Sequence, residues 1–310
     1  MNYEIKEISF PSSNGTDTVR GKIYIPKDKE PRGIVQLSHG MVDHVGRYEA
    51  LAEYLTGKGY IFAGNDHIGH GMTAASDEDL GFFAKSCGVD LLLSDLYTMN
   101  KLLFDTYGIK PVLMGHSMGS FLSRLYTSRY PDSITAHIIH GTGGPMPILP
   151  LGKALVNIII AFRGARHRSA LVKKMAFMGY NSKFPKSEGA EAWLTRDLDR
   201  VANRSSDRLT SFTFTVSAYR DLFFAVGESN SKKWFEEYPK DMKTLILSGD
   251  MDPVGNYGKG PSYVFRALLD AGCRDVRLKL YEGARHELFN ELCREEAFSD
   301  IADWLESIYK

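Results

Sequence analysis

The sequence predicts an α/β protein with a mostly parallel, doubly wound sheet and a helical block inserted late in the chain. Three observations predict this fold class. Short β-branched runs end in glycine-rich loops, helical periodicity follows most of these runs, and the alternation stops over one long stretch before it resumes. Continuous apolar strands are typical of a parallel sheet that helices cover on both faces. Alternation of strands with helices implies right-handed crossovers.

The strands of the predicted sheet are short. Residues 5–25 are typical of a hairpin around Ser12-Ser13-Asn14-Gly15, which we expect to be antiparallel at the sheet edge. The other predicted strands are 33–40, 60–66, 111–115, 134–140, 244–249 and 276–281. Apolar residues at helical spacing predict helices between them, over 48–58, 89–107 and 118–130.

The helical block lies between about Pro145 and Pro239, where the sequence is amphipathic and contains no convincing strand. Its predicted helices are 151–162, 169–178, 188–202 and 210–226. Ligands of open α/β sheets bind at the carboxyl ends of the strands. We therefore expect residues 145–239 to form a cap (lid) over these ends, and residues 1–144 and 240–310 to form the core.

Composition and charge exclude several classes of protein. The 310 residues are 43% apolar and 25% charged, which is close to the average of soluble globular proteins. Lys+Arg and Asp+Glu both number 38, so the basic excess expected of a nucleic-acid-binding protein is missing. The N-terminus lacks the apolar run of a signal peptide, and the longest apolar stretch, 148–162, is interrupted and too short for a transmembrane segment.

The cysteines indicate a reducing compartment. Cys87, Cys273 and Cys293 form no CxxC pair and no zinc-binding spacing. An odd, sparse set of this kind is typical of reduced thiols. Together with the missing signal peptide, it predicts a cytoplasmic enzyme.

The segment Gly115-His116-Ser117-Met118-Gly119 lies between a predicted strand and a predicted helix. A GxSxG sequence can arise by chance, but this strand–turn–helix context is that of the nucleophile elbow of α/β-hydrolases. A turn this tight leaves no room for side chains at the two flanking positions, where glycine stands. We therefore predict that Ser117 is a nucleophile, raised into the cleft beside the N–H groups of a helix N-terminus.

A serine nucleophile needs a base and an acid, which follow it in this chain order in the α/β-hydrolase fold. His286 is the only histidine C-terminal to the predicted cap and follows a predicted strand, so it is the expected base. Asp250 and Asp252 both lie in the loop after the strand 244–249, where an aspartate can also serve simply to form the turn. We choose Asp252 as the acid, with Asp250 as the alternative.

The oxyanion formed in such a reaction needs two N–H donors. We expect one from Met118, the residue after the nucleophile, and the other from Met41 in the loop after the strand 33–40. His39 and Gly40 belong to this loop, and His39 is expected to orient it. Asp66 and His67 are expected to brace the neighbouring loop.

A metal ion or cofactor is not expected. His39, His44, His67 and His70 share no helical face, and the chain contains no HExxH sequence. The glycine-rich segment 141–145 has neither the spacing of a dinucleotide-binding fingerprint nor the lysine of a phosphate-binding loop.

Four segments together resemble the monoacylglycerol lipases and bacterial lysophospholipases of the serine aminopeptidase S33 type. Residues 38–48 resemble their HGxxEHxxRY loop, 66–71 their DHxGHG loop, 115–119 their elbow and 281–288 their histidine loop. Asp43 departs from the usual glutamate, Met72-Thr73 from the usual polar-Ser ending, and Ser120 from a frequent glycine. The family's acid lies in a G-x-x-D pattern, which in this sequence ends at Asp252.

The resemblance implies a helical cap over an acyl-chain tunnel, no cofactor, and hydrolysis of monoacylglycerols, lysophospholipids or simple carboxylic esters. The expected partner is thus a small-molecule ester with an acyl chain, and the cap could contact a membrane surface transiently. The methionines of 175–178 suit packing in the cap or a lipid-facing pocket.

Two alternatives compete with an esterase. A peptidase or amidase for small substrates would use the same three residues, and an acidic cluster in the pocket would favour it. A largely apolar pocket would favour esters. A non-catalytic binding protein on this fold would carry a damaged triad or oxyanion hole, and the sequence shows damage to neither. Epoxide hydrolases and dehalogenases are disfavoured because they place aspartate at the elbow.

Overall fold

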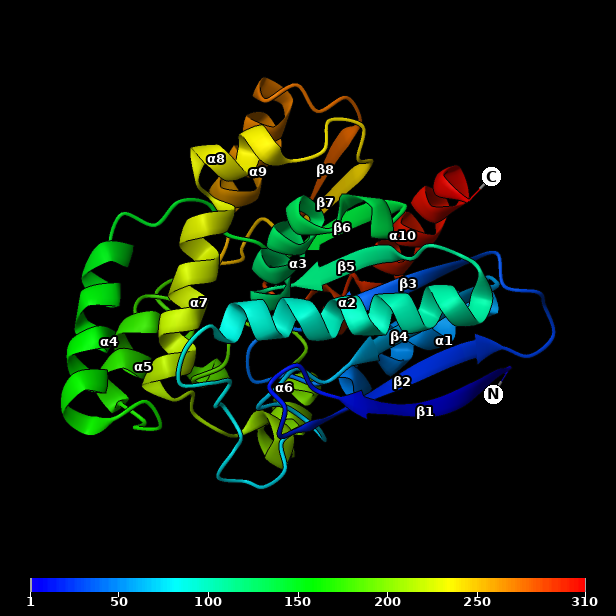
Figure 1. The fold of residues 1–310 in the computed structure, drawn as a ribbon. Coiled ribbons are helices and arrows are strands. Elements are labelled where there is room, and N and C mark those ends of the chain that lie inside the picture. The colour runs from blue at the N-terminus through cyan, green and yellow to red at the C-terminus, as the bar shows by residue number, and fades with distance from the viewer. Residues whose placement is uncertain (1, 310) are drawn as a thin grey trace.

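The computed structural model describes residues 2–309, whose eight strands form one mixed, mostly parallel sheet. Figure 1 shows this sheet at the centre of the molecule, in the order β1-β2-β4-β3-β5-β6-β7-β8. The strands are β1 (Tyr3–Pro11), β2 (Thr18–Pro26), β3 (Gly33–Ser38), β4 (Tyr60–Asn65), β5 (Val112–His116), β6 (Ala136–His140), β7 (Thr244–Gly249) and β8 (Val276–Tyr281). The hairpin β1–β2 is antiparallel at one edge, and the six strands β3 to β8 run parallel, so the predicted fold class is confirmed.

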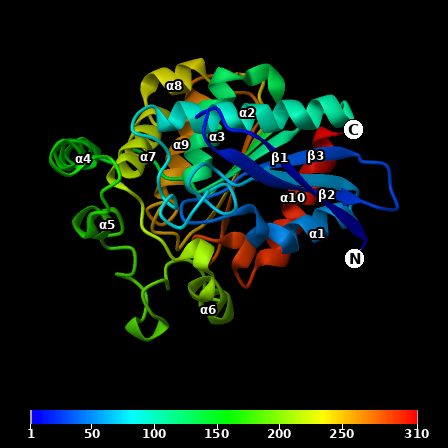
Figure 2. The same ribbon diagram turned by 60° about the horizontal axis from the view of Figure 1, so that its bottom comes forward.

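Helices cover both faces of the sheet, as the two views in Figures 1 and 2 show. One face packs against α1 and α10, and the other packs against α2, α3 and α9, with α7 and α8 packed on α3. These helices are α1 (Glu49–Gly57), α2 (Gly88–Tyr107), α3 (Met118–Arg129), α7 (Val216–Ser229), α8 (Lys232–Glu237), α9 (Lys259–Asp270) and α10 (Arg294–Ile308). The strands β3 to β7 are buried along their whole length, which explains why they are continuous apolar runs in the sequence.

The segment between β6 and β7 is helical, and its helix boundaries differ from the predicted ones. In addition to α7 and α8 it contains α4 (Leu149–Arg163), α5 (Ala170–Ala176) and α6 (Leu198–Ser206). The predicted start of a helix at residue 188 is wrong, because α6 begins only after Asp197, whose carboxylate accepts the N–H of Arg200. The predicted start at residue 210 is wrong for the same reason, because Thr215 caps α7.

The helices α4 and α5 lie beyond the carboxyl ends of the parallel strands and stand away from the sheet (Figures 1 and 2). They expose large apolar side chains to solvent: Leu151, Ile158, Phe162 and Leu171. Transient contact of this surface with a membrane stays a prediction. Within residues 2–309, the helices are too short or too polar to cross a bilayer.

Candidate active site

Ser117 lies in the tight turn between β5 and α3. Its backbone has φ 52° and ψ −119°, which is uncommon and strained for a residue other than glycine. The turn requires glycine two residues later, because a Cβ on Gly119 would lie 1.9 Å from the carbonyl oxygen of Ser38. Gly115, on the other side, has Ser123 Oγ and the Gly119 carbonyl as close neighbours. The local geometry is thus a strand–turn–helix elbow, in which the Ser117 side chain projects from the tip of the turn.

His286 lies between Ser117 and Asp252. Its Nε2 is 2.9 Å from Ser117 Oγ, and its Nδ1 is 2.9 Å from Asp252 Oδ2. A carboxylate can only accept, so Nδ1 carries the proton and Nε2 is free to accept from the serine hydroxyl. Asp252 is fully buried, and its other oxygen accepts the N–H of Val254.

Asp250, the alternative acid, does not reach the imidazole. Its Oδ1 accepts the N–H of Gly283 at 2.8 Å, which ties the loop after β7 to the loop after β8. Asp250 therefore accepts a backbone N–H and stabilises a loop, as aspartates in turns often do. The choice between the two aspartates depends on this difference in contacts.

The loop after β3 lies against the nucleophile. A Cβ on Gly40 would lie 3.2 Å from Ser117 Cβ and 3.1 Å from His116 Cδ2, so a larger residue here would press on both side chains. Met41 follows in this loop, and Met118 is the first residue of α3, where a backbone N–H has no partner within the helix. Both methionines line the same pocket as Ser117 and His286.

His39 fixes the loop on which Met41 lies. Its Nδ1–H donates to the Gly40 carbonyl at 2.9 Å, and its Nε2 accepts the N–H of His67 at 2.9 Å. Asp66 accepts the N–H groups of Val45 and Met72, so it joins the same two loops. Burial lowers the pKa of His39 and of His67, which keeps both rings neutral. In the part of the chain that the structure describes, no three histidine, cysteine or acidic side chains are arranged to hold a metal ion.

His116 lies near His286 and has a neutral ring. Its Nδ1 is 2.9 Å from Nδ1 of His140, so the two rings must be opposite tautomers that share one proton. Burial, and to a smaller extent the nearby His286, lowers the pKa of His116 to about 3. His116 therefore stays uncharged and does not repel a positive charge that forms on His286.

The pocket beside Ser117 has a volume of about 990 Å³. Its wall comes from α3 and from the helical segment between β6 and β7, and most of the wall is apolar. Side chains that make this apolar wall include Phe121, Leu149, Phe177, Phe212, Leu222 and Phe223. Trp193 covers the imidazole, with its ring centre 5.1 Å from that of His286. The cavity thus has room for a flexible acyl chain next to the serine.

Charged residues brace the two loops that bring Met41 and His286 to the pocket. Arg47 donates to Asp43 Oδ1 at 2.8 Å and to both oxygens of Glu287 at 3.1 and 2.7 Å. Asp43 also accepts the N–H of Gly40 and the hydroxyl of Tyr48. Burial opposes the ionisation of Glu287, but Arg47 and Arg204 outweigh it and lower the pKa of Glu287 to about 2.

This ion pair predicts a pH-dependent stability. Because the pKa of Glu287 is about 2 in the fold and 4.5 in the unfolded chain, the pair stabilises the protein above about pH 4.5. The stabilisation is lost as the pH falls from there towards 2. Glu287→Gln is expected to lower the free energy of unfolding by about 3 kcal/mol at pH 7, and the difference should shrink between pH 5 and pH 3.

Urea unfolding of both proteins at several pH values measures this difference. Glu282→Gln is the matched control, because Glu282 lies in the same loop but is exposed. The control should change the free energy of unfolding by a similar small amount at every pH. A Glu287→Gln effect that stays constant between pH 7 and pH 3 would show that the ion pair does not stabilise the fold.

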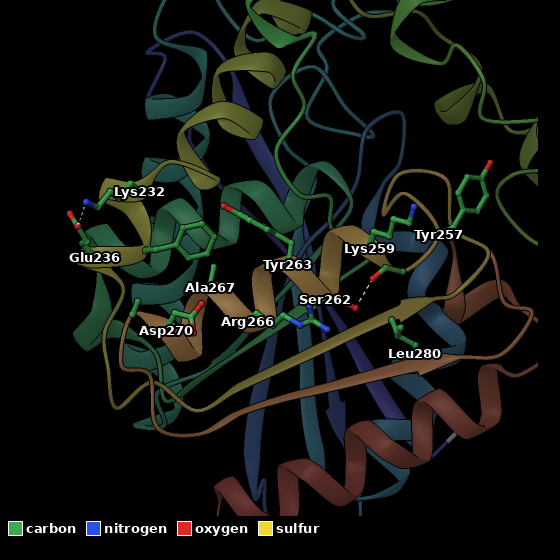
Figure 3. Close-up of a pocket in the computed structure, with 13 residues that line it drawn as sticks. Lys232, Glu236, Tyr257, Lys259, Ser262, Tyr263, Arg266, Ala267, Asp270 and Leu280 are labelled. Carbon is green, nitrogen blue, oxygen red and sulfur yellow. Dashed lines mark hydrogen bonds and ion pairs between the residues drawn. The ribbon is translucent and has the colours of Figure 1, made fainter.

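A second pocket lies on another part of the surface, between α8, α9 and β8 (Figure 3). It has a volume of about 920 Å³, and Lys259, Ser262 and Arg266 of α9 lie along it. None of the site residues predicted from the sequence lines it. The predicted residues gather instead around the pocket that contains Ser117.

Several residues of the site were not predicted from the sequence. Arg47 and Glu287 lie in the loops that carry two of the motifs, but nothing in the sequence shows that residues 240 positions apart form an ion pair. Trp193 and Arg204 come from the helical segment, which carries no recognisable motif. The signal that could have indicated Glu287 is its place directly after His286.

Comparison with known proteins identifies the family. The model of the family described as "Serine aminopeptidase, S33" matches residues 29–293. The chain belongs to this family. It is similar to a monoacylglycerol lipase of Mycolicibacterium smegmatis, with 24% identity and 97% of each chain covered. It is also similar to the human monoglyceride lipase, with 26% identity over 89% of this chain and 82% of the human protein.

Solved structures of an esterase and a lipase have the same fold. A thermostable carboxyl esterase from Bacillus coagulans, in complex with glycerol, superposes with a TM-score of 0.92 at 28% identity, and 99% of each chain is covered. A monoglyceride lipase variant from Saccharomyces cerevisiae superposes with a TM-score of 0.78 at 20% identity, over 99% of this chain and 96% of the yeast one. The protein is an α/β-hydrolase of the esterase and lipase group.

Proposed function

We propose that this protein is a serine esterase of the monoacylglycerol lipase type, with Ser117 as nucleophile, His286 as base and Asp252 as the acid that orients it. One observation carries the proposal. The imidazole of His286 lies at 2.9 Å from both the hydroxyl of Ser117 and the carboxylate of Asp252. This is the geometry that turns a weakly nucleophilic hydroxyl into an effective nucleophile.

In the first half of the reaction, Ser117 Oγ attacks the ester carbonyl while its proton moves to His286 Nε2. The negative charge passes to the carbonyl oxygen, and Asp252 stabilises the imidazolium through the Nδ1–H bond. Collapse of the tetrahedral intermediate breaks the bond to the alcohol, which takes the proton back from Nε2. The acyl group then remains on Ser117.

In the second half, a water molecule gives a proton to Nε2 and attacks the acyl-enzyme. The carboxylic acid leaves, and the proton returns to Ser117 Oγ. We assign the two oxyanion donors to the N–H groups of Met41 and Met118, which belong to the loop beside Ser117 and to the start of α3. Each donor of this kind lowers the barrier by about 3 kcal/mol.

The substrate is proposed to be an ester with a medium or long acyl chain. The apolar wall of the pocket supports this proposal, as do the monoacylglycerol and monoglyceride lipases among the similar proteins. We propose that residues 145–239 act as the cap, because α4, α5 and α7 of this segment all line the pocket above Ser117. Burial of the chain among them contributes about 0.8 kcal/mol for each CH₂ group.

An amide-cleaving function has less support, although the family description names an aminopeptidase. The carboxylates of Asp43, Glu191 and Glu287 lie along one side of the pocket and could attract the amino group of a peptide. Arg47 and Arg204 form ion pairs with all three. Each carboxylate thus already has a cationic partner, and Lys173 and Lys174 also line the pocket, so the lining favours a neutral head group over a cationic one.

A series of p-nitrophenyl esters tests the substrate class. Because each buried CH₂ group can contribute about 0.8 kcal/mol, kcat/KM is expected to rise up to about fourfold for each added carbon until the pocket is filled. Aminoacyl-naphthylamides are expected to react at least about 100-fold more slowly than the best ester. A flat profile, or an amide that reacts faster than every ester, would contradict the proposal.

A further inference from the structure

Val42, the residue after the proposed oxyanion donor Met41, has a strained backbone. Its φ is 53°, in the left-handed region that a β-branched side chain rarely adopts. Strain of this kind persists only when surrounding groups hold the residue in place. The Met41 N–H belongs to the preceding peptide unit, Gly40–Met41, whose carbonyl is held by His39. Val42 is the next residue along, and its conformation fixes where the loop runs after Met41.

Two side chains hold the backbone polar groups of Val42. The Val42 N–H donates to Nε2 of His70 at 3.2 Å, and the Val42 carbonyl accepts from Nη2 of Arg204 at 3.2 Å. His70 can accept because it is neutral: burial lowers its pKa to about 3. Its Nδ1–H donates to the Ile68 carbonyl. His70 comes from the core loop after β4, whereas Arg204 comes from α6.

Arg204 connects three parts of the molecule through one guanidinium group. Besides the Val42 carbonyl, it forms an ion pair with Glu191 of the helical segment and lies 3.8 Å from Glu287, the neighbour of His286. The side chain is only 10% exposed, so these interactions are largely shielded from water. A second link between the same regions joins His44 to Asp207 at 2.8 Å.

We propose that Arg204 is a positioning residue for the oxyanion hole: when α6 is docked, Arg204 holds the Val42 carbonyl and so keeps in place the loop that carries the Met41 N–H. This inference rests on the proposed function and extends it to regulation of the same site. When α6 is docked, Val42 is held by both His70 and Arg204. When α6 moves away, the loop loses one of its two ties and the hole loses a preorganised donor.

Arg204→Met tests this role, with Arg200→Met as the matched control. Arg200 lies on the same helix, and among residues 2–309 its guanidinium forms no ion pair. Removing one oxyanion donor lowers kcat about 10²–10³-fold, so loosening one should lower it about 10–100-fold, with KM changed less than about threefold. Arg204→Lys, which keeps a donor, should recover part of the loss, and Arg200→Met should leave kcat unchanged.

Inhibitor affinities separate positioning from substrate contact. A trifluoromethyl ketone with the same acyl chain forms a tetrahedral oxyanion on Ser117, whereas the corresponding ether binds without one. Arg204→Met should lower the affinity for the ketone by about the same factor as kcat/KM and leave the affinity for the ether unchanged. Thermal unfolding checks the fold. If Arg204→Met does not fold, Arg204→Lys must still bind the ketone more weakly than the wild type, by a smaller factor, with the affinity for the ether unchanged.

Three results would overturn the inference. They are an unchanged kcat in Arg204→Met, a loss confined to KM with equal weakening of ketone and ether, and an equal loss in Arg200→Met. In each of these cases the wild-type protein still hydrolyses esters, so the proposed function stands. A wild-type protein that hydrolyses no ester and does not react with the ketone would overturn both.

Discussion

Ser117→Ala is expected to lower kcat for p-nitrophenyl esters by at least about 10⁴-fold, because removal of a serine nucleophile removes the whole covalent route. The hydroxyl is the group that His286 Nε2 contacts at 2.9 Å, and α3 begins at the next residue. Alanine has the same backbone requirements as serine in the turn, so the melting temperature should change by no more than a few degrees. Initial rates and thermal unfolding of the same preparation measure both effects.

A serine away from the pocket provides the control. Ser94→Ala on α2 removes a hydroxyl that donates only to the backbone carbonyl of Asp90. It should retain the wild-type kcat and KM. Activity of Ser117→Ala within tenfold of the wild type would contradict a covalent mechanism at this residue.

Asp252→Asn is expected to have the second-largest effect, a loss of about 10⁴-fold in kcat with the fold intact. Asparagine can occupy the same space, but its amide can donate to Nδ1 and so favour the tautomer whose Nε2 carries the proton. In that tautomer, His286 cannot accept the proton of Ser117. Because Asp252 is fully buried, water cannot take the place of the lost carboxylate.

Asp250→Asn is the matched control, since it makes the same change two residues earlier. Its carboxylate contacts the Gly283 N–H and not the imidazole, so we expect less than about a fivefold change in kcat. Steady-state kinetics of both variants on one ester decide between the aspartates. A larger loss in Asp250→Asn than in Asp252→Asn would show that the acid has been assigned to the wrong residue.

The parts of the fold that depend on local sequence could be predicted. The five strands β3 to β7 are continuous apolar runs because the sheet is covered on both faces there, and the elbow around Ser117 has glycine wherever the turn excludes a side chain. The starts of α6 and α7 were misplaced because Asp197 and Thr215 end the preceding loops as caps, which outweighs the periodicity of the residues before them. The sequence prediction also omitted α8, α9 and α10.

The parts of the site that depend on distant contacts could be predicted only in part. Motif order points to Ser117 and His286, but the choice between Asp250 and Asp252 requires the direction of each side chain after β7. The ion pairs of Arg47 and Arg204 with Glu287 join residues that lie far apart in the chain. No local pattern reports such a pair, because charged residues at these spacings are usually solvated on the surface.

The most direct measurement of the proposed mechanism is covalent labelling with an alkyl fluorophosphonate, followed by peptide mass spectrometry. The reagent phosphonylates a serine only where a base activates its hydroxyl. The mechanism predicts one adduct, on the peptide that contains Ser117, with labelling at least about 100-fold slower in His286→Ala and absent in Ser117→Ala. An adduct on another residue, or labelling of Ser117 at an unchanged rate in His286→Ala, would contradict it.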